Sequence, residues 1–268
     1  MKCKVTKKWL CLAALFCGVS AAQPAETHEQ RGKRVVYEAL NALGGQAFLQ
    51  MQDRTETGRA YSFYNQQITG LSVATIYTRY LAPVPGKVEQ RERQAFGKDK
   101  SSSTLFTENG AWEITFRGAR PIEDRQYEQY LDSTLHNIFY ILRQRLHEPG
   151  MQFYSQGSDI YENQPVEIVD ITDADGRTVT VYFNQDTKLP VKQTFKRRNE
   201  TYHDFDQETT IFAKYRDSGG VKWPWNIHRE RNGEKIYEMY SESVEMNKDL
   251  RDDLFSLPVN AKLLPKAK

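Results

Sequence analysis

The chain has 268 residues, of which 39% are hydrophobic, 12% aromatic and 27% charged, and its formal net charge is +2. Its aromatic content, and the lack of any run of about 18 apolar residues, exclude a protein of several membrane spans, a coiled coil and a disordered tail. We therefore expect a protein that folds around its own core.

The first 22 residues have the pattern of a secretory signal peptide. Basic residues come first, an apolar stretch covers 9–19, and Ser20-Ala21-Ala22 supplies the small residues of a cleavage site. Lipid anchoring through Cys17 is the alternative, but Phe16 stands where a lipoprotein needs a small residue. The sequence predicts a periplasmic protein with a cleaved leader at 1–22, one domain at 23–258 and a loose tail at 259–268.

Removal of this leader changes the cysteine content and the charge. Cys3, Cys11 and Cys17 all lie within it, so the rest of the chain has no disulfide, thiolate metal ligand or cysteine nucleophile. Taking its four lysines from the 37 basic residues leaves 33 against 35 acidic ones. A nearly neutral chain lacks the basic surface that binds nucleic acid, so no nucleic-acid partner is expected, and Lys196-Arg197-Arg198 is interpreted as a solvated strand end.

The first half of the chain is predicted to contain one short helix followed by strands. Val35, Val36, Leu40 and Leu43 recur at helical spacing over 31–43, and Gly44-Gly45 follows. Asn109-Gly110 between two alternating runs indicates a hairpin. The strand-like runs are 47–52, 59–65, 71–80, 87–96, 103–108 and 111–117.

A long helix is predicted next, over 124–147, because its apolar residues recur with a period of about 3.6. Pro149-Gly150 ends it. Strand-like runs then follow near 152–154, 166–171, 177–183, 191–197, 209–215, 222–229 and 234–244. The fold class is mainly β with α: an open antiparallel half-barrel of about 11 strands, curled by strand twist and covered by a lid of helices.

Few residues suggest catalysis. His136 and His147 would lie about 16 Å apart along one helix, on its polar side, and cannot share a metal. The Asp170 to Gly176 segment is interpreted as a hairpin turn and not a calcium loop. The segment 202–206, with His203 between carboxylates, is interpreted as a surface loop, and Trp223-Pro224-Trp225 as core more readily than as a ligand-stacking pair. No metal and no cofactor is expected.

Several ordered segments together resemble the periplasmic LolA-like superfamily, which includes LolA, LolB and the RseB sensory domain. The segments are Ala39 to Gly45, Asn163 to Val166, Val179 to Phe183, Asp186 to Val191, Gly219 to Pro224, and Asp253 to Pro258. The resemblance implies an open antiparallel barrel, helices as a lid, and an apolar cavity for acyl chains.

Three functions follow as hypotheses. The first is a non-enzymatic carrier, used in lipoprotein sorting or lipid binding, that shields the acyl chains of a lipid or lipoprotein. The second is an envelope sensor or scaffold that binds another protein, and the third is a hydrolase using His203 with Asp204 or Asp206. The candidate cavity-lining residues of the carrier are Trp112, Ile114, Phe116, Leu131, Leu135, Ile138, Leu142, Val179, Val181 and Phe183.

Overall fold

A computed structural model describes residues 25–266 of the chain, so the predicted leader and Cys17 lie outside the described residues. These residues form one antiparallel sheet of 13 strands, open at β6 and β7, where about 11 strands were expected. The strands are β1 (Asp53–Tyr64), β2 (Gln67–Tyr80), β3 (Gln90–Phe96), β4 (Ser102–Thr107), β5 (Gly110–Thr115), β6 (Gly118–Pro121), β7 (Gln152–Tyr161), β8 (Gln164–Thr172), β9 (Thr178–Asn184), β10 (Pro190–Asn199), β11 (Asp204–Ser218), β12 (Val221–Arg231) and β13 (Glu234–Met246).

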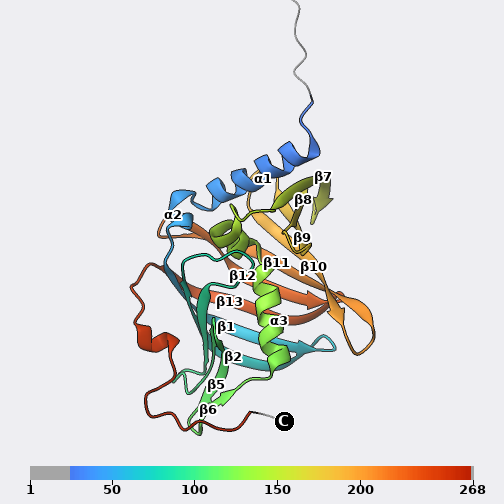
Figure 1. Cartoon of the computed structure of the whole chain (residues 1–268). Helices are drawn as coiled ribbons and strands as arrows, with labels where there is room; N and C mark the ends of the chain where they lie inside the picture. Colours follow the sequence, from blue (N-terminus) through green and yellow to red (C-terminus); the bar gives the residue numbers. More distant parts are fainter. Residues whose placement is uncertain (1–24, 267–268) are drawn as a thin grey trace, which may run out of the picture.

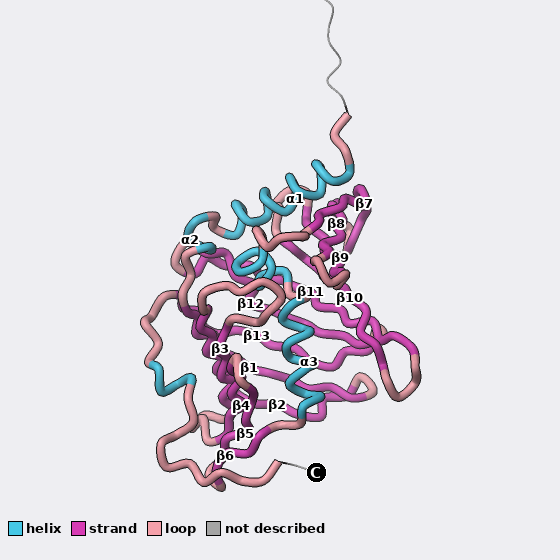
Figure 2. The backbone as a smooth tube through the Cα atoms, viewed as in Figure 1, coloured by secondary structure: helices cyan, strands magenta, loops and turns pink. Residues whose placement is uncertain are grey.

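The sheet joins two meanders, one from each half of the chain. Strands β1 to β6 follow one another outward, strands β13 back to β7 do the same on the other side, and β1 pairs with β13 where the two meet. In that central pair Arg54 lies opposite Met246 and Ser62 opposite Tyr237. Figure 2 shows how the strands wrap around the helical segment in the middle of the chain. The concave face of the sheet is therefore built from both halves.

Helix α1 (His28–Leu43) begins and ends at well-defined caps. The Thr27 side chain accepts from the backbone of Gln30, whose side chain accepts from the Thr27 backbone, and Gly44 ends the helix with φ 127°. The predicted strand over 47–52 is wrong at its start, because α2 (Gln46–Leu49) turns there. Phe48 is fully buried, and a short apolar run does not distinguish a strand from a buried helical turn.

The predicted continuous helix over 124–147 is also wrong. It is interrupted after α3 (Asp124–Leu135), and the chain resumes as α4 (Ile138–Tyr140) and the π-helical η1 (Ile141–Arg145). Asn137 starts the second segment, since its Oδ1 accepts from the amides of Phe139 and Tyr140. Apolar residues expected on one stripe therefore belong to separate clusters.

The main core lies at the α1 end of the molecule. Figure 1 shows α1 across the end of the sheet that carries β7 and β8. Buried residues of α1, α4 and η1 pack there against the apolar faces of β8, β9 and β12. The approach is close, because a Cβ added at Gly32 would lie 2.7 Å from the Phe153 carbonyl oxygen.

The C-terminal segment covers the outer face of the other half-sheet. Phe255 of the 3₁₀ turn η2 (Asp252–Phe255) packs with Tyr77 and Ala95. Further on, the amide of Ala119 donates to the carbonyl of Lys262, and the amide of Leu264 donates to the carbonyl of Ala119. Within the segment 259–268, expected as a loose tail, the backbone of residues 262–264 thus pairs with β6.

Candidate functional site: the hollow beneath α3

A hollow of about 220 Å³ lies between helices α3 and α4 and the concave face of the sheet. Figure 1 shows α3 crossing the face of β12, β13, β1 and β2. Inward-facing residues of β1, β2, β3, β10, β11, β12 and β13 form the walls. We call this space the α3 hollow. Both meanders contribute to it, so no short segment of the sequence contains the site.

Part of the lining is apolar and aromatic. The ring of Phe139 lies 5.0 Å from that of Phe212 and 4.7 Å from that of Trp223, measured between centroids. Ile227 and Met239 lie on the neighbouring positions of β12 and β13. Phe139, Phe212 and Trp223 are buried members of the main core, so the apolar floor of the α3 hollow is an edge of that core that faces the open space.

Charged groups also line the α3 hollow. Glu56 is almost fully buried, at 1% exposure, and accepts from Ser241 Oγ at 2.5 Å and from Trp223 Nε1 at 3.3 Å. The guanidinium of Arg54 lies 4.1 Å over the Trp223 ring and donates to Thr78 Oγ1 at 3.0 Å. Arg54 Nε lies 3.8 Å from Glu56 Oε2, so these two charges compensate each other.

Glu92 of β3 forms no ion pair with any residue in the described part of the chain. Its carboxylate accepts from Gln94 Nε2 at 2.6 Å. Burial raises the pKa of Glu92 above its ordinary value, because desolvation disfavours the charged form more than this hydrogen bond and the charge of Arg54 favour it.

A group of arginines meets one carboxylate beside the helix. Glu208 of β11 is 2% exposed, and its Oε1 accepts from Arg197 Nη1 at 3.1 Å and from Arg231 Nε at 2.9 Å. Arg229 lies two residues before Arg231 on β12 and opposite Thr210 of β11. Its guanidinium lines the α3 hollow and makes no hydrogen bond or ion pair to any residue within 25–266.

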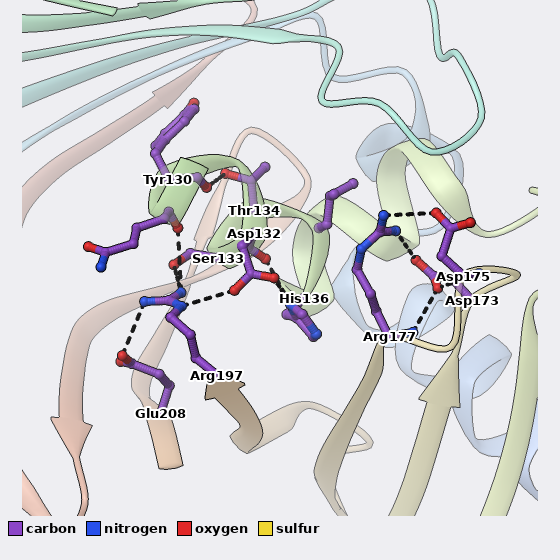
Figure 3. A network of polar contacts seen from close by, with 12 residues as sticks. Tyr130, Asp132, Ser133, Thr134, His136, Asp173, Asp175, Arg177, Arg197 and Glu208 are labelled. Carbon is purple, nitrogen blue, oxygen red and sulfur yellow. Dashed lines mark hydrogen bonds and ion pairs between the residues drawn. The ribbon is translucent and has the colours of Figure 1, made fainter. Parts of the chain in front are cut away.

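Arg197 also fastens α3 to the sheet (Figure 3). Its guanidinium donates to Asp132 Oδ2 at 3.0 Å and to Ser133 Oγ at 2.6 Å. Burial raises the pKa of Asp132, but the hydrogen bonds and charges of His136 and Arg197 outweigh it, so the net shift is downward. One side chain of β10 thus holds the C-terminal end of α3.

Aromatic contacts hold the opposite side of α3. The Tyr130 ring stacks on Phe106 of β4 with centroids 3.8 Å apart, and Tyr130 Oη accepts from Gln90 Nε2 at 2.9 Å. Tyr127 Oη donates to the carbonyl of Thr107 at 2.7 Å. Helix α3 is therefore attached to both half-sheets across the α3 hollow.

None of the ten predicted cavity-lining residues lines the α3 hollow. Leu131 and Leu135 pack beside it against Val88 and Tyr140. Those buried in the main core are Ile138, Leu142, Val179, Val181 and Phe183. On β5 and the turn after it, Trp112 and Ile114 pack under the C-terminal segment and Phe116 is 87% exposed. Their role in ligand binding stays a prediction.

Apolar alternation does not predict the polar lining of the α3 hollow. In β3, Gln90, Glu92 and Gln94 face the α3 hollow, while Arg91 and Arg93 occupy the alternate positions. A strand that is polar on both faces, inside a sheet covered by a helix, is the signal that predicts a polar interior.

The histidines differ from one another. His147 is exposed, as predicted, but the prediction of an exposed His136 is wrong. His136 is 6% exposed and its ring stacks on Phe195 with centroids 4.2 Å apart, because the interruption after α3 turns it toward β10. His203 lies exposed in the β10–β11 turn, so the interpretation of 202–206 as a surface loop is confirmed for Tyr202 and His203 and is wrong for 204–206, which begin β11.

The two remaining candidate segments have structural roles. Asp173 accepts from the amides of Asp175 and Arg177 within a hairpin turn, as predicted. Trp223 is buried in the main core cluster and also lines the α3 hollow. Within the described part of the chain, no group of three or more histidine, cysteine or acidic side chains could hold a metal ion. None of the helices there is long and apolar enough to cross a membrane.

Solved structures with the same arrangement of strands and helices identify the fold. A putative outer membrane lipoprotein-sorting protein domain from Vibrio parahaemolyticus is 13% identical, with a TM-score of 0.58, over 85% of this chain and 97% of that one. A LolA superfamily protein from Nitrosomonas europaea is 12% identical, with a TM-score of 0.51, over 84% of this chain and 97% of that one. The chain has the LolA-like fold.

A DUF1329 family protein from Desulfovibrio piger shares the LolA-like fold as well. It is 12% identical, with a TM-score of 0.59, over 86% of this chain and 98% of that one. Neither a protein-family model nor a curated protein sequence matches the chain. At identities this low, the likeness concerns the LolA-like fold and not the individual site residues.

Proposed function

We propose that the chain is an exported protein of the cell envelope that binds one amphiphilic ligand, a lipid or the acyl chain of a lipoprotein, in the α3 hollow and carries it. The observation that supports this most is the open space over Phe212, Trp223, Ile227 and Met239, beneath a helix that is separate from the main core. The leader-like sequence at 1–22 supports export to the periplasm.

The mixed lining suits an amphiphile better than a purely apolar ligand. Each methylene placed on the aromatic floor contributes about 0.8 kcal/mol. Arg54, Glu92 and Arg229 keep polar atoms at the walls, and a ligand without polar groups would cover them without satisfying them. An amphiphile gives each part of the lining a matching partner.

The size of the space limits what it holds. A volume of about 220 Å³ is below the 300–1,000 Å³ of pockets that enclose drug-sized ligands. We therefore propose that a single chain with its head group enters, and that a bulky lipid with several chains enters only in part.

Filling the α3 hollow tests the proposal. Thr210 lines it, so Thr210→Trp should abolish binding of a fluorescent fatty acid and remove any lipid seen by native mass spectrometry of the full chain. Thr178→Trp, at an exposed position of β9, is the matched control and should bind as the parent does. If both variants and the parent bind equally, or none binds, the proposal is wrong.

A second candidate function is supported by a different surface. Tyr64, Ile68 and Leu71 of the β1–β2 hairpin are each more than 60% exposed, and neighbouring exposed apolar residues are typical of protein interaction sites. An envelope scaffold would lose its protein partner in an Ile68→Ser, Leu71→Ser variant while its lipid binding stayed unchanged. In a carrier, Thr210→Trp would lose lipid binding, and binding of a protein partner would stay unchanged.

A further inference from the structure

We propose that the α3 hollow selects amphiphiles whose head group is anionic, a carboxylate or a phosphate, and that Arg229 is the residue that recognises this head group. The inference rests on the proposed function, because it names the class of ligand that the same site takes. It depends on the charges that this chain carries along β10, β11 and β12.

One of the three guanidinium groups near Glu208 has no ion-pair partner among the described residues. Arg197, Arg229 and Arg231 lie close to this single carboxylate, and Glu208 contacts the first and the last of them. Arg197 also binds Asp132 of α3. The three arginines therefore meet two carboxylates, and Arg229 remains without a partner among the described residues.

An uncompensated guanidinium at this position favours a bound anion. Arg229 is only partly exposed, and burial lowers its pKa, while the nearby charge of Glu208 acts in the opposite direction. Its five N–H donors form a planar fork that matches the oxygens of a carboxylate or phosphate. A ligand that brings those oxygens supplies the hydrogen bonds that the protein does not.

The other charges of the α3 hollow do not cancel Arg229. Glu56 is occupied by Arg54, Ser241 and Trp223. Glu92 lies on β3, four strands away from β12 in the sheet.

The apolar floor continues directly from Arg229. Ile227 precedes it by two residues on β12, so both side chains face the same side of the sheet, and Ile227 lies opposite Phe212 of β11. A chain whose head group is bound at Arg229 can therefore extend over Ile227 and Phe212 toward Trp223. This order of charge and apolar surface is that of an anionic amphiphile.

Calorimetric titration of the full chain tests the inference with dodecanoate, dodecyl phosphate and the uncharged dodecanol, each below its micellar concentration. The two anions should bind more tightly than dodecanol. Arg229→Gln should weaken anion binding about tenfold to a hundredfold, the range for hydrogen bonds to a charged group, and leave dodecanol binding unchanged. Inorganic phosphate alone should bind far more weakly than dodecyl phosphate.

Controls separate recognition from folding. Arg251→Gln changes an arginine whose side chain is 82% exposed and should alter no affinity. Arg229→Lys keeps the charge and should retain part of the preference for anions, and thermal unfolding of each variant checks the fold. Equal binding of dodecanol and dodecanoate, or an unchanged preference in Arg229→Gln, overturns the role of Arg229 while the carrier proposal stands. If inorganic phosphate binds as tightly as dodecyl phosphate, the ligand needs no apolar chain and the proposal of an amphiphilic ligand is wrong. If no probe binds, both proposals are wrong.

Discussion

Replacing Arg197 by methionine should loosen α3 and destabilise the protein. The variant removes hydrogen bonds to Asp132, Ser133 and Glu208 while keeping an unbranched side chain at the position. Breaking a buried ion pair from one side costs about 3–5 kcal/mol when the remaining charge has no other partner. Here Glu208 keeps Arg231 and Asp132 keeps His136, so we expect a loss of about 2–3 kcal/mol in the free energy of unfolding.

Urea unfolding measures this loss directly. With a slope of about 3 kcal/mol per molar urea, the midpoint should fall by up to about 1 M. Hydrogen exchange should also become faster at the backbone amides of α3, since the side of the helix facing β10 loses its attachment.

The neighbouring arginine gives a matched control. Arg198 is exposed and alternates with Arg197 along β10, so Arg198→Met should stay within about 0.5 kcal/mol of the parent. If the two variants unfold at the same urea concentration, or if α3 exchanges no faster in Arg197→Met, the idea that Arg197 holds the helix is refuted.

Three further changes test other parts of the structure. Gly32→Ala should lower the urea midpoint although alanine favours helix, since the added Cβ would lie 2.7 Å from the Phe153 carbonyl oxygen; an unchanged midpoint contradicts this. Glu92→Gln should raise the free energy of unfolding at pH 7. Because the pKa of Glu92 is raised by folding, its ionisation opposes folding, and the advantage of the variant over the parent should grow as pH rises above about 4.5. If urea unfolding gives parent and variant the same dependence of stability on pH, this reasoning is wrong. Arg145→Met removes a 2.7 Å partner from both Asp173 and Glu148. Because Asp173 keeps Arg177 and Glu148 keeps the amide of Gly86, the midpoint of thermal unfolding should fall by about 4–12 °C, and a change under 2 °C contradicts a stabilising role of Arg145.

The sequence by itself determined most of the elements and the mainly β class of the fold. Alternation and turn residues predicted most of the strands, and the helical spacing of Val35, Val36, Leu40 and Leu43 predicted α1. These signals are local, because each depends only on residues close together in the chain. The resemblance to LolA-like proteins followed from the order of such local segments.

Long-range packing decided the rest. The interruption at Asn137 is stabilised by Gln193 of β10, whose Oε1 accepts from the amide of Ile138 at 2.9 Å, and a periodic apolar pattern contains no sign of that contact.

The candidate site is a product of tertiary structure in the same way. Arg54, Glu92 and Arg229 lie on strands from different parts of the chain and face one hollow only after β1 pairs with β13. Neighbouring strands decide whether an inward-facing charge is compensated. Glu208 of β11 forms an ion pair with Arg197 and none with Arg229. The sequence specified which strands form, and the pairing of distant strands decided which charges remain available to a ligand.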